Sequence, residues 1–162
     1  LTEQRHAPAG TRLITLLEAD EVAVLPAGHT LLARRRLRLQ DLARLPFVSL
    51  AAGDPYREEL DSLFDQARVP RNLALEAGSA VAVCSLVREG LGVAVVNPLT
   101  ALAMAGPDLH LRPLNVKVAF HVGLVTPELR PPSPLREAFV LALQATAASR
   151  MAQLKLALGL AA

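Results

Sequence analysis

Short apolar runs alternate with segments of helical periodicity along most of this chain, beginning near residue 37. The run at 47–50 is followed by a segment whose apolar residues recur at helical spacing: Leu60, Leu63, Phe64 and Ala67. A second extended run, at 73–76, is followed by a similar segment from Ser79 to Val87. Because a helix between two strands returns the chain to start a parallel neighbour, this alternation predicts an α/β domain with a largely parallel sheet.

Capping residues mark the ends of both expected helices. Asp54 stands directly before Pro55, and Ser79 stands at the start of the second segment. Side-chain oxygens at such positions accept hydrogen bonds from the unpaired N–H groups of the first helical turn. Gly90 follows the second segment and is expected to end that helix.

The stretch from Leu91 to Val96 is almost entirely apolar, as a parallel strand covered by helices on both faces requires. We expect Val93–Val96 and the two earlier runs to form three neighbouring parallel strands. A short helix from about Thr100 to Met104 and a strand from Leu109 to Leu114 are predicted to follow.

Two extended segments, residues 21–26 and 118–126, flank this unit, and we expect them to pair as strands that cross between two lobes. The predicted division of the chain is as follows: 1–29, remnant of a first lobe with one crossing strand; 30–116, a complete α/β lobe; 117–148, the return crossing strand and a last helix; 149–162, a C-terminal tail that is helical by propensity. The expected last helix carries an apolar stripe: Leu135, Phe139, Ala142 and Leu143.

Composition excludes several classes of protein. The chain has 162 residues, of which 52% are apolar and 20% charged, so it is globular rather than disordered, and no apolar run approaches the roughly 20 residues of a membrane span. A net charge of +2 and an aromatic content of 3% do not indicate nucleic-acid binding by this chain. The single cysteine and the charged first 20 residues indicate a cytoplasmic protein without a signal peptide.

No pattern in the sequence indicates catalysis, a metal or a cofactor. The four histidines lack metal-ligand spacing, and Ser79 does not lie in a Gly-x-Ser-x-Gly motif. Gly90 and Gly92 follow a helix and precede a strand, which is the reverse of a dinucleotide-binding motif. The arginines at 34–38 are interpreted as a solvated face, although a phosphate-binding patch is the alternative.

The starts of the two expected helices, at 53–57 and 78–82, are the candidate binding site. Both follow strands, so they should lie at the carboxyl edge of the sheet, where open α/β folds bind ligands. Free N–H groups there would attract a carboxylate, and Asp54 and Glu76 could receive an ammonium group. The alternative is that Asp54 and Ser79 only cap their helices.

Taken in order, these elements resemble the effector-binding domain of LysR-type transcription regulators. The most specific stretch, from Leu75 to Pro98, is LEAGSAVAVCSLVREGLGVAVVNP. Further similarity lies in EVAVLPAGHTL at 21–31 and in an Arg-Pro-x-Ser pattern at Arg130–Ser133. The resemblance implies a two-lobed fold of the type II periplasmic-binding-protein kind, with the second lobe complete and the first truncated in this chain.

The resemblance also implies a cytoplasmic homo-oligomer that binds a small effector between its lobes and contacts DNA only through an N-terminal winged helix-turn-helix domain, which this chain lacks. Carried onto this sequence, the effector site falls on these residues: Ala52, Asp54, Tyr56, Ser79 and Asn97. Pro55, Gly78 and Ala80 depart from the family's more polar pattern, which leaves the effector's identity open.

An amino-acid-like effector, diaminopimelate or lysine, is favoured because the resemblance is strongest to a regulator of lysine biosynthesis. Two alternatives stay open. The chain could belong to a regulator of opine or basic amino-acid catabolism in the same family, or it could be a free-standing solute-binding protein. An export signal would distinguish the second alternative.

Overall fold

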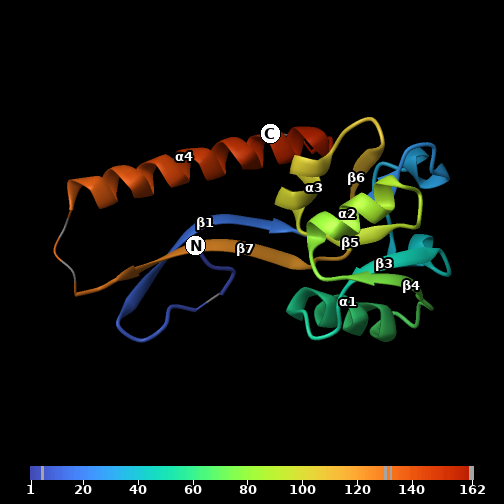
Figure 1. Ribbon diagram of the computed structural model, residues 1–162, viewed down its shortest axis with the longest axis horizontal. Helices are drawn as coiled ribbons and strands as arrows, with labels where there is room; N and C mark the ends of the chain where they lie inside the picture. Colours follow the sequence, from blue (N-terminus) through green and yellow to red (C-terminus); the bar gives the residue numbers. More distant parts are fainter. Residues whose placement is uncertain (5, 130, 132, 161–162) are drawn as a thin grey trace.

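The computed structural model describes residues 1–4, 6–129, 131 and 133–160, so Arg130 and Pro132 of the Arg-Pro-x-Ser pattern lie outside the described residues. The chain forms a larger lobe, a two-stranded ribbon that extends from it, and a long helix that runs over both (Figure 1). The lobe contains the following elements: β2 (Val22–Pro26), η1 (Thr30–Ala33), η2 (Leu39–Leu42), β3 (Pro46–Leu50), α1 (Pro55–Gln66), β4 (Asn72–Ala77), α2 (Ala80–Arg88), β5 (Ala94–Val96), α3 (Pro98–Met104) and β6 (Leu109–Pro113). The ribbon consists of β1 (Thr11–Asp20) and β7 (Ala119–Pro127), and the long helix is α4 (Pro134–Ala157).

The strands of the lobe lie in the order β4-β3-β5-β2-β6. β3 pairs with β4 in parallel, and β2 pairs antiparallel with β5 on one side and β6 on the other. The two groups are joined by a parallel bridge between Phe47 and Val93, with 2.9 Å hydrogen bonds from the Val48 amide to the Val93 carbonyl and from the Val93 amide to the Pro46 carbonyl. The prediction of three neighbouring parallel strands is confirmed, although β2 makes the whole sheet mixed.

Gly92 makes this bridge between β3 and β5 possible. Its φ is +157°, and a Cβ atom at this position would lie 2.4 Å from the Pro46 carbonyl oxygen, which is itself a partner in the bridge. Any other residue would therefore push the two strands apart.

The sheet is buried on both faces, which explains its continuous apolar runs. Along β2, Ala23 and Leu25 face a core with Phe47 and Phe64 under α1, whereas the alternate residues Val22 and Val24 face a core under α2 and α3. Figure 1 shows α1 on one side of these strands and α2 and α3 on the other. Side chains that alternate between two apolar cores leave no polar face on the strand.

The prediction that segments 21–26 and 118–126 pair with each other was wrong. β7 pairs antiparallel with β1 from Asp20↔Ala119 to Thr11↔Pro127, and β2 instead lies between β5 and β6. One hydrogen bond joins the two crossing segments, from the Glu21 amide to the Val118 carbonyl, at 2.8 Å. Since β2 is buried on both faces, it is a central strand of the lobe, and the partner of β7 is the earlier alternating segment at 11–20.

Helix α4 is longer than the segment expected to end near 148, because it continues through the Ala- and Leu-rich residues to Ala157. The predicted stripe packs only in part, since Leu135 is 81% exposed and Phe139 58% exposed, whereas Leu143 is half-buried. The half-buried or buried residues that face the rest of the molecule are Val140, Leu143, Ala147, Met151 and Leu154. Leu154 is 3% exposed and joins the core that also contains Val83 and Ala101. No helix among the described residues is long and apolar enough to cross a membrane.

We expect Leu154→Ala to lower the free energy of unfolding by about 2–4 kcal/mol, because it deletes a fully packed side chain and leaves a cavity. Leu156→Ala is the matched control on the same turn of α4, since Leu156 is 82% exposed. Leu156→Ala should change the free energy of unfolding by no more than about 0.5 kcal/mol. Urea denaturation followed by circular dichroism measures both, and equal effects would show that this end of α4 does not pack on the lobe.

Candidate functional site

Three helices begin at one edge of the lobe's sheet, because β3, β4 and β5 are parallel and each is followed by a helix. Each helix has a capping side chain. Asp54 Oδ1 accepts from the amides of Tyr56 (2.9 Å) and Arg57 (3.2 Å), Ser79 Oγ accepts from Ala82 (3.3 Å), and Asn97 Oδ1 accepts from Thr100 (2.8 Å). The capping interpretation of Asp54 and Ser79 is therefore confirmed.

This capping corrects the expectation of free N–H groups at the start of α1. The amides of Tyr56 and Arg57 are already bonded to a carboxylate of the chain itself. A ligand carboxylate would have to displace Asp54 or approach its negative charge, and either is unfavourable. The start of α1 is therefore a poor site for an anion.

Glu76, expected to receive an ammonium group, is instead paired with Arg57. The Arg57 side chain is 9% exposed; its Nη1 donates to Glu76 Oε1 at 2.9 Å and to the Leu50 carbonyl at 2.8 Å, and its Nε donates to Asp61 at 2.8 Å. The guanidinium thus ties the end of β3, the first turns of α1 and β4 together.

Arg71 extends this network below α1. It donates to Asp61, and its guanidinium lies 5.1 Å and 5.2 Å from the ring centres of Phe47 and Phe64. Burial, with repulsion from Arg57, lowers its pKa to about 10. The aromatic faces stabilise the charge by cation–π attraction, so α1 is held to the sheet through both charge and packing.

A hollow of about 550 Å³ lies beside the start of α1 and is lined by Glu3, Gln4, Asp54, Pro55, Tyr56 and Glu59. We call it the crossing hollow, because the crossing segments lie next to it. The Tyr56 ring is 5.8 Å from that of Phe120 on β7, and its hydroxyl is hydrogen-bonded to Glu3 and to the backbone of His121. Burial and the nearby Glu3 raise the pKa of Tyr56 to about 12, so the phenol is neutral.

Of the predicted effector-site residues, only Asp54 and Tyr56 line the crossing hollow. Ala52 and Ser79 are exposed and Asn97 is half-buried. All three lie at the same edge of the sheet but do not line the crossing hollow. Glu3 and Glu59 line the hollow but were not predicted, because Glu3 approaches Tyr56 only through the tertiary fold.

Glu21, which lines a separate hollow of about 190 Å³ and not the crossing hollow, is the most perturbed acid among the described residues. It is 2% exposed, and its Oε1 atom has no hydrogen-bond partner among the described residues. Burial, together with repulsion from Asp54, Glu59 and Glu3, raises its pKa to about 8. The sequence signal that could have identified it is an acid directly before the wholly apolar strand β2.

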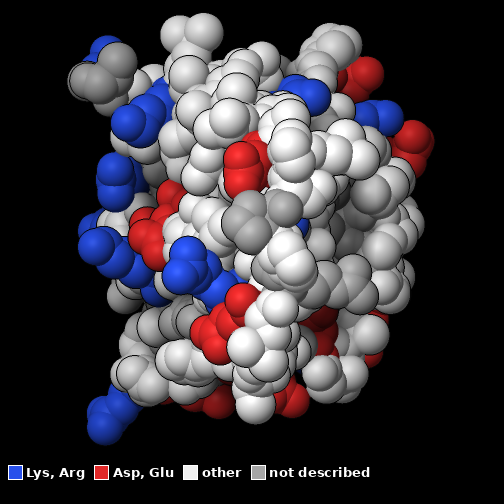
Figure 2. Space-filling view, turned by 90° about the vertical axis from the view of Figure 1, so that its left-hand side faces the viewer, with Lys and Arg blue, Asp and Glu red and all other residues white. Residues whose placement is uncertain are grey.

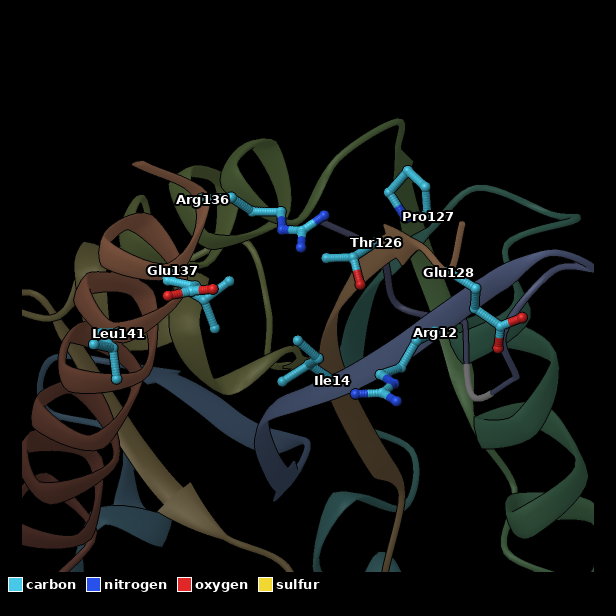
Figure 3. Close-up of a pocket in the computed structure, with 9 residues that line it drawn as sticks. Arg12, Ile14, Thr126, Pro127, Glu128, Arg136, Glu137 and Leu141 are labelled. Carbon is cyan, nitrogen blue, oxygen red and sulfur yellow. The ribbon is translucent and has the colours of Figure 1, made fainter. Parts of the chain in front are cut away.

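A larger hollow, of about 750 Å³, lies between α4 and the ribbon (Figure 3). Arg136 and Glu137 project from the helix, facing Arg12 and Ile14 on β1 and Thr126 on β7. The crossing hollow, in contrast, lies at the helix starts along the carboxyl edge of the sheet, where open α/β folds bind ligands. We therefore take it as the better candidate for recognising a small ligand.

The sequence profile described as "LysR substrate binding domain" matches residues 1–148. The chain belongs to this family. It is 46% identical over 145 residues to the Transcriptional activator protein LysR of Escherichia coli (strain K12), across 90% of this chain and 47% of that protein. It is 30% identical over 122 residues to the Regulatory protein NocR of Agrobacterium tumefaciens (strain T37), across 75% of this chain and 41% of that protein. The chain therefore spans less than half the length of these relatives.

Solved structures of regulatory and effector-binding domains share this fold. The Synechocystis PCC6803 CcmR regulatory domain in complex with 2-PG aligns with a TM-score of 0.71 at 17% identity, covering 90% of this chain and 71% of that one. The effector-binding domain of QuiR in complex with shikimate aligns with a TM-score of 0.62 at 19% identity, covering 86% of this chain and 66% of that one. The expected two-lobed, type II periplasmic-binding-protein-like α/β fold is thus confirmed.

The raised pKa of Glu21 predicts that stability falls as pH rises. The folded chain keeps this proton up to about pH 8, whereas the unfolded chain loses it near 4.5, so the unfolded state binds fewer protons in between. The free energy of unfolding should therefore decrease across that window, by at most about 1.4 kcal/mol per pH unit from this group. Glu21→Gln should remove this component and be more stable than the wild type above pH 8. Urea denaturation at several pH values measures this component, with Glu128→Gln, at an exposed carboxylate, as control. An unchanged slope in Glu21→Gln would contradict the assignment.

Proposed function

We propose that this chain is the effector-sensing part of a LysR-type transcription regulator, a DNA-binding protein rather than an enzyme. The observation that carries the proposal is the polar edge of the sheet, where three helix starts and the crossing hollow lie beside the segments that join lobe and ribbon. A ligand bound there would touch both parts of the molecule and so could change their relative positions. A regulator that acts on bacterial DNA works in the cytoplasm.

We propose that the effector is a small amino-acid-like metabolite, with diaminopimelate or lysine favoured, bound at the sheet edge by Ala52, Asp54, Tyr56, Ser79 and Asn97. The acidic lining of the crossing hollow supports a ligand with an ammonium group, since Glu3, Asp54 and Glu59 all face it. The similarity to the Escherichia coli LysR activator supports a regulator of lysine synthesis. The 30% identity to NocR favours, as second candidate, a regulator of opine or basic amino-acid catabolism.

DNA contact is proposed to belong to an N-terminal winged helix-turn-helix domain and not to these residues. Arg34 and Arg38 pair with Asp41 at 3.3 Å and 3.2 Å, and Arg36 donates to the Leu114 carbonyl at 3.1 Å, so these arginines have partners within the lobe. Figure 2 shows the end of the molecule at the ribbon, where basic side chains lie mainly along one edge with acidic ones beside them. A continuous basic surface, which duplex DNA requires, is not seen on that face.

Calorimetric titration of the full-length protein with meso-diaminopimelate and L-lysine tests the proposed site. Ser79→Ala should weaken binding by about 1 kcal/mol by removing one neutral hydrogen bond, and Tyr56→Ala and Asn97→Ala should also weaken it. Ser85→Ala is the matched control on α2, because the Ser85 hydroxyl bonds only to the Val81 carbonyl of the same helix in the described structure. Thermal stability is measured in parallel to separate loss of a cap from loss of a contact. Unchanged affinity in all three variants would place the effector elsewhere.

We also propose that the chain forms a homo-oligomer through the open edge of β4. Leu73 and Leu75 on this edge strand are 39% and 37% exposed, and Val81 and Leu91 nearby in the chain are 53% and 47% exposed. An edge strand offers unpaired backbone groups, and the same apolar patch on a second copy would be self-complementary about a two-fold axis.

Sedimentation velocity should therefore show a dimer or larger species that Leu75→Lys shifts to lower mass, because a charge would be buried without a partner in the interface. Leu156→Lys, at an exposed site on α4, should leave the distribution unchanged. A clean monomer at high concentration in the wild type would contradict assembly by this edge.

A further inference from the structure

A hollow of about 580 Å³ lies between the arginine-rich segment that follows η1 and the C-terminal end of α4. We call it the arginine hollow, because four arginines line its lobe side: Arg34, Arg35, Arg36 and Arg112. Residues 156–160 form the opposite wall, and they lie beyond residues 1–148, which the family profile matches. The arginine hollow shares no lining residue with the crossing hollow, so it is separate from the proposed effector site.

Two of these arginines are held in place by hydrogen bonds that do not cancel their charge. The guanidinium of Arg112 donates to three backbone carbonyls of the lobe, at distances of 2.7 to 2.9 Å. Arg36 donates to the Leu114 carbonyl at 3.1 Å. A guanidinium has five N–H donors, and a carbonyl is neutral. These bonds therefore fix the two side chains while leaving donors unused and the positive charge uncompensated.

Acidic groups of the lobe balance little of this charge. No described Asp or Glu lines the arginine hollow. Asp41 pairs with Arg34 at 3.3 Å and with Arg38 at 3.2 Å, so one carboxylate serves two guanidinium groups. The Arg35 side chain has neither an ion pair nor a hydrogen bond to any described residue. The end of α4 adds only a partial negative charge, about half an elementary charge, so the hollow is net positive.

The α4 side of the arginine hollow is apolar. Leu156 is 82% exposed and Leu160 39% exposed, and Leu158 between them is half-buried. Small-molecule sites are commonly of this size and combine apolar walls with a few fixed polar or charged groups. Leucines across from guanidinium groups suit a ligand that has an anionic head and an apolar body.

We propose that the arginine hollow is a second ligand site, which binds a small organic anion. Arg35, Arg36 and Arg112 hold its carboxylate or phosphate group, and its apolar part lies against the leucines of α4. Guanidinium groups suit both head groups, because their planar array of N–H donors matches the oxygens of a carboxylate or a phosphate. An anion bound here ties the C-terminal end of α4 to the arginine-rich segment of the lobe.

Calorimetry of the full-length protein at low salt tests the inference with four probes: hexanoate, hexyl phosphate, 1-hexanol and acetate. The first two carry an anionic head on the same alkyl chain, 1-hexanol has the chain without the charge, and acetate has the charge without the chain. We expect hexanoate or hexyl phosphate to bind more tightly than 1-hexanol and acetate, and the tighter of the two anions identifies the preferred head group. Added NaCl should weaken binding, because salt screens exposed charges.

Arg35→Gln should weaken binding of the better anion by about two- to five-fold, the range for one exposed charge pair, without loss of an internal contact. The double variant Arg35→Gln/Arg36→Gln should weaken it by roughly four- to 25-fold if the two charges act independently. Leu156→Glu should also weaken it, because a negative charge on the α4 wall repels the anion. Arg150→Gln is the matched control, since it removes an exposed arginine of α4 that does not line the hollow, and it should leave the affinity unchanged.

Thermal denaturation shows whether each variant is folded, and Arg35→Gln and Leu156→Glu decide the result if loss of Arg36 destabilises the lobe. Equal affinity for 1-hexanol and the anions would show an apolar crevice without charge recognition and overturn the proposal. So would failure of both anions to bind, or unchanged affinity in Arg35→Gln, the double variant and Leu156→Glu alike. None of these results bears on the proposed effector site, which uses other residues and is tested with other ligands.

Discussion

The buried guanidinium of Arg57 is the interaction on which the geometry of the candidate site depends. It joins the Leu50 carbonyl at the end of β3, Asp61 within α1 and Glu76 on β4, and these three groups come from successive elements of the chain. A guanidinium suits this place because it stays charged when buried and donates in several directions at once. Without it, two carboxylates and a carbonyl would lose their shared donor, and the turn that carries Asp54 and Tyr56 would no longer be fixed to β4.

The position of the site follows from the way the sheet is buried. Strands with apolar side chains on both faces need helices on both sides, and parallel neighbours place the starts of those helices at one edge. Every helix start needs acceptors for its free amides, and here Asp54, Ser79 and Asn97 supply them. The polar groups that look most suitable for a ligand are therefore largely occupied by the fold. A ligand at this edge would therefore share Asp54, Ser79 and Asn97 with the helix starts that they already cap.

Local signals in the sequence predicted the parts of the fold that depend on few residues. Asp54, Ser79 and Gly90 mark helix ends through their own side chains or backbone freedom, and the structure places them as expected. Pairing of β1 with β7 joins residues about 100 apart, and no local pattern distinguishes that partner from β2. The α4 stripe was predicted only in part for a similar reason, because a helix rich in Ala and Leu offers several apolar faces and tertiary packing chooses among them. At the site, sequence identified Asp54 and Tyr56 but not Arg57 or Glu21, whose roles depend on contacts with other elements.

The burial of Glu21 follows from the topology rather than from its own side chain. β2 lies between β5 and β6, so the residue before it is enclosed as soon as the chain leaves the ribbon. An apolar residue there would avoid both the desolvation of a carboxyl group and the repulsion from Asp54, Glu59 and Glu3. The protonated form reduces this cost but does not remove it, because the Oε1 atom has no donor among the described residues. Glu21 therefore lowers the stability of the fold at the junction between ribbon and lobe, and its burial there is imposed by the strand order around β2.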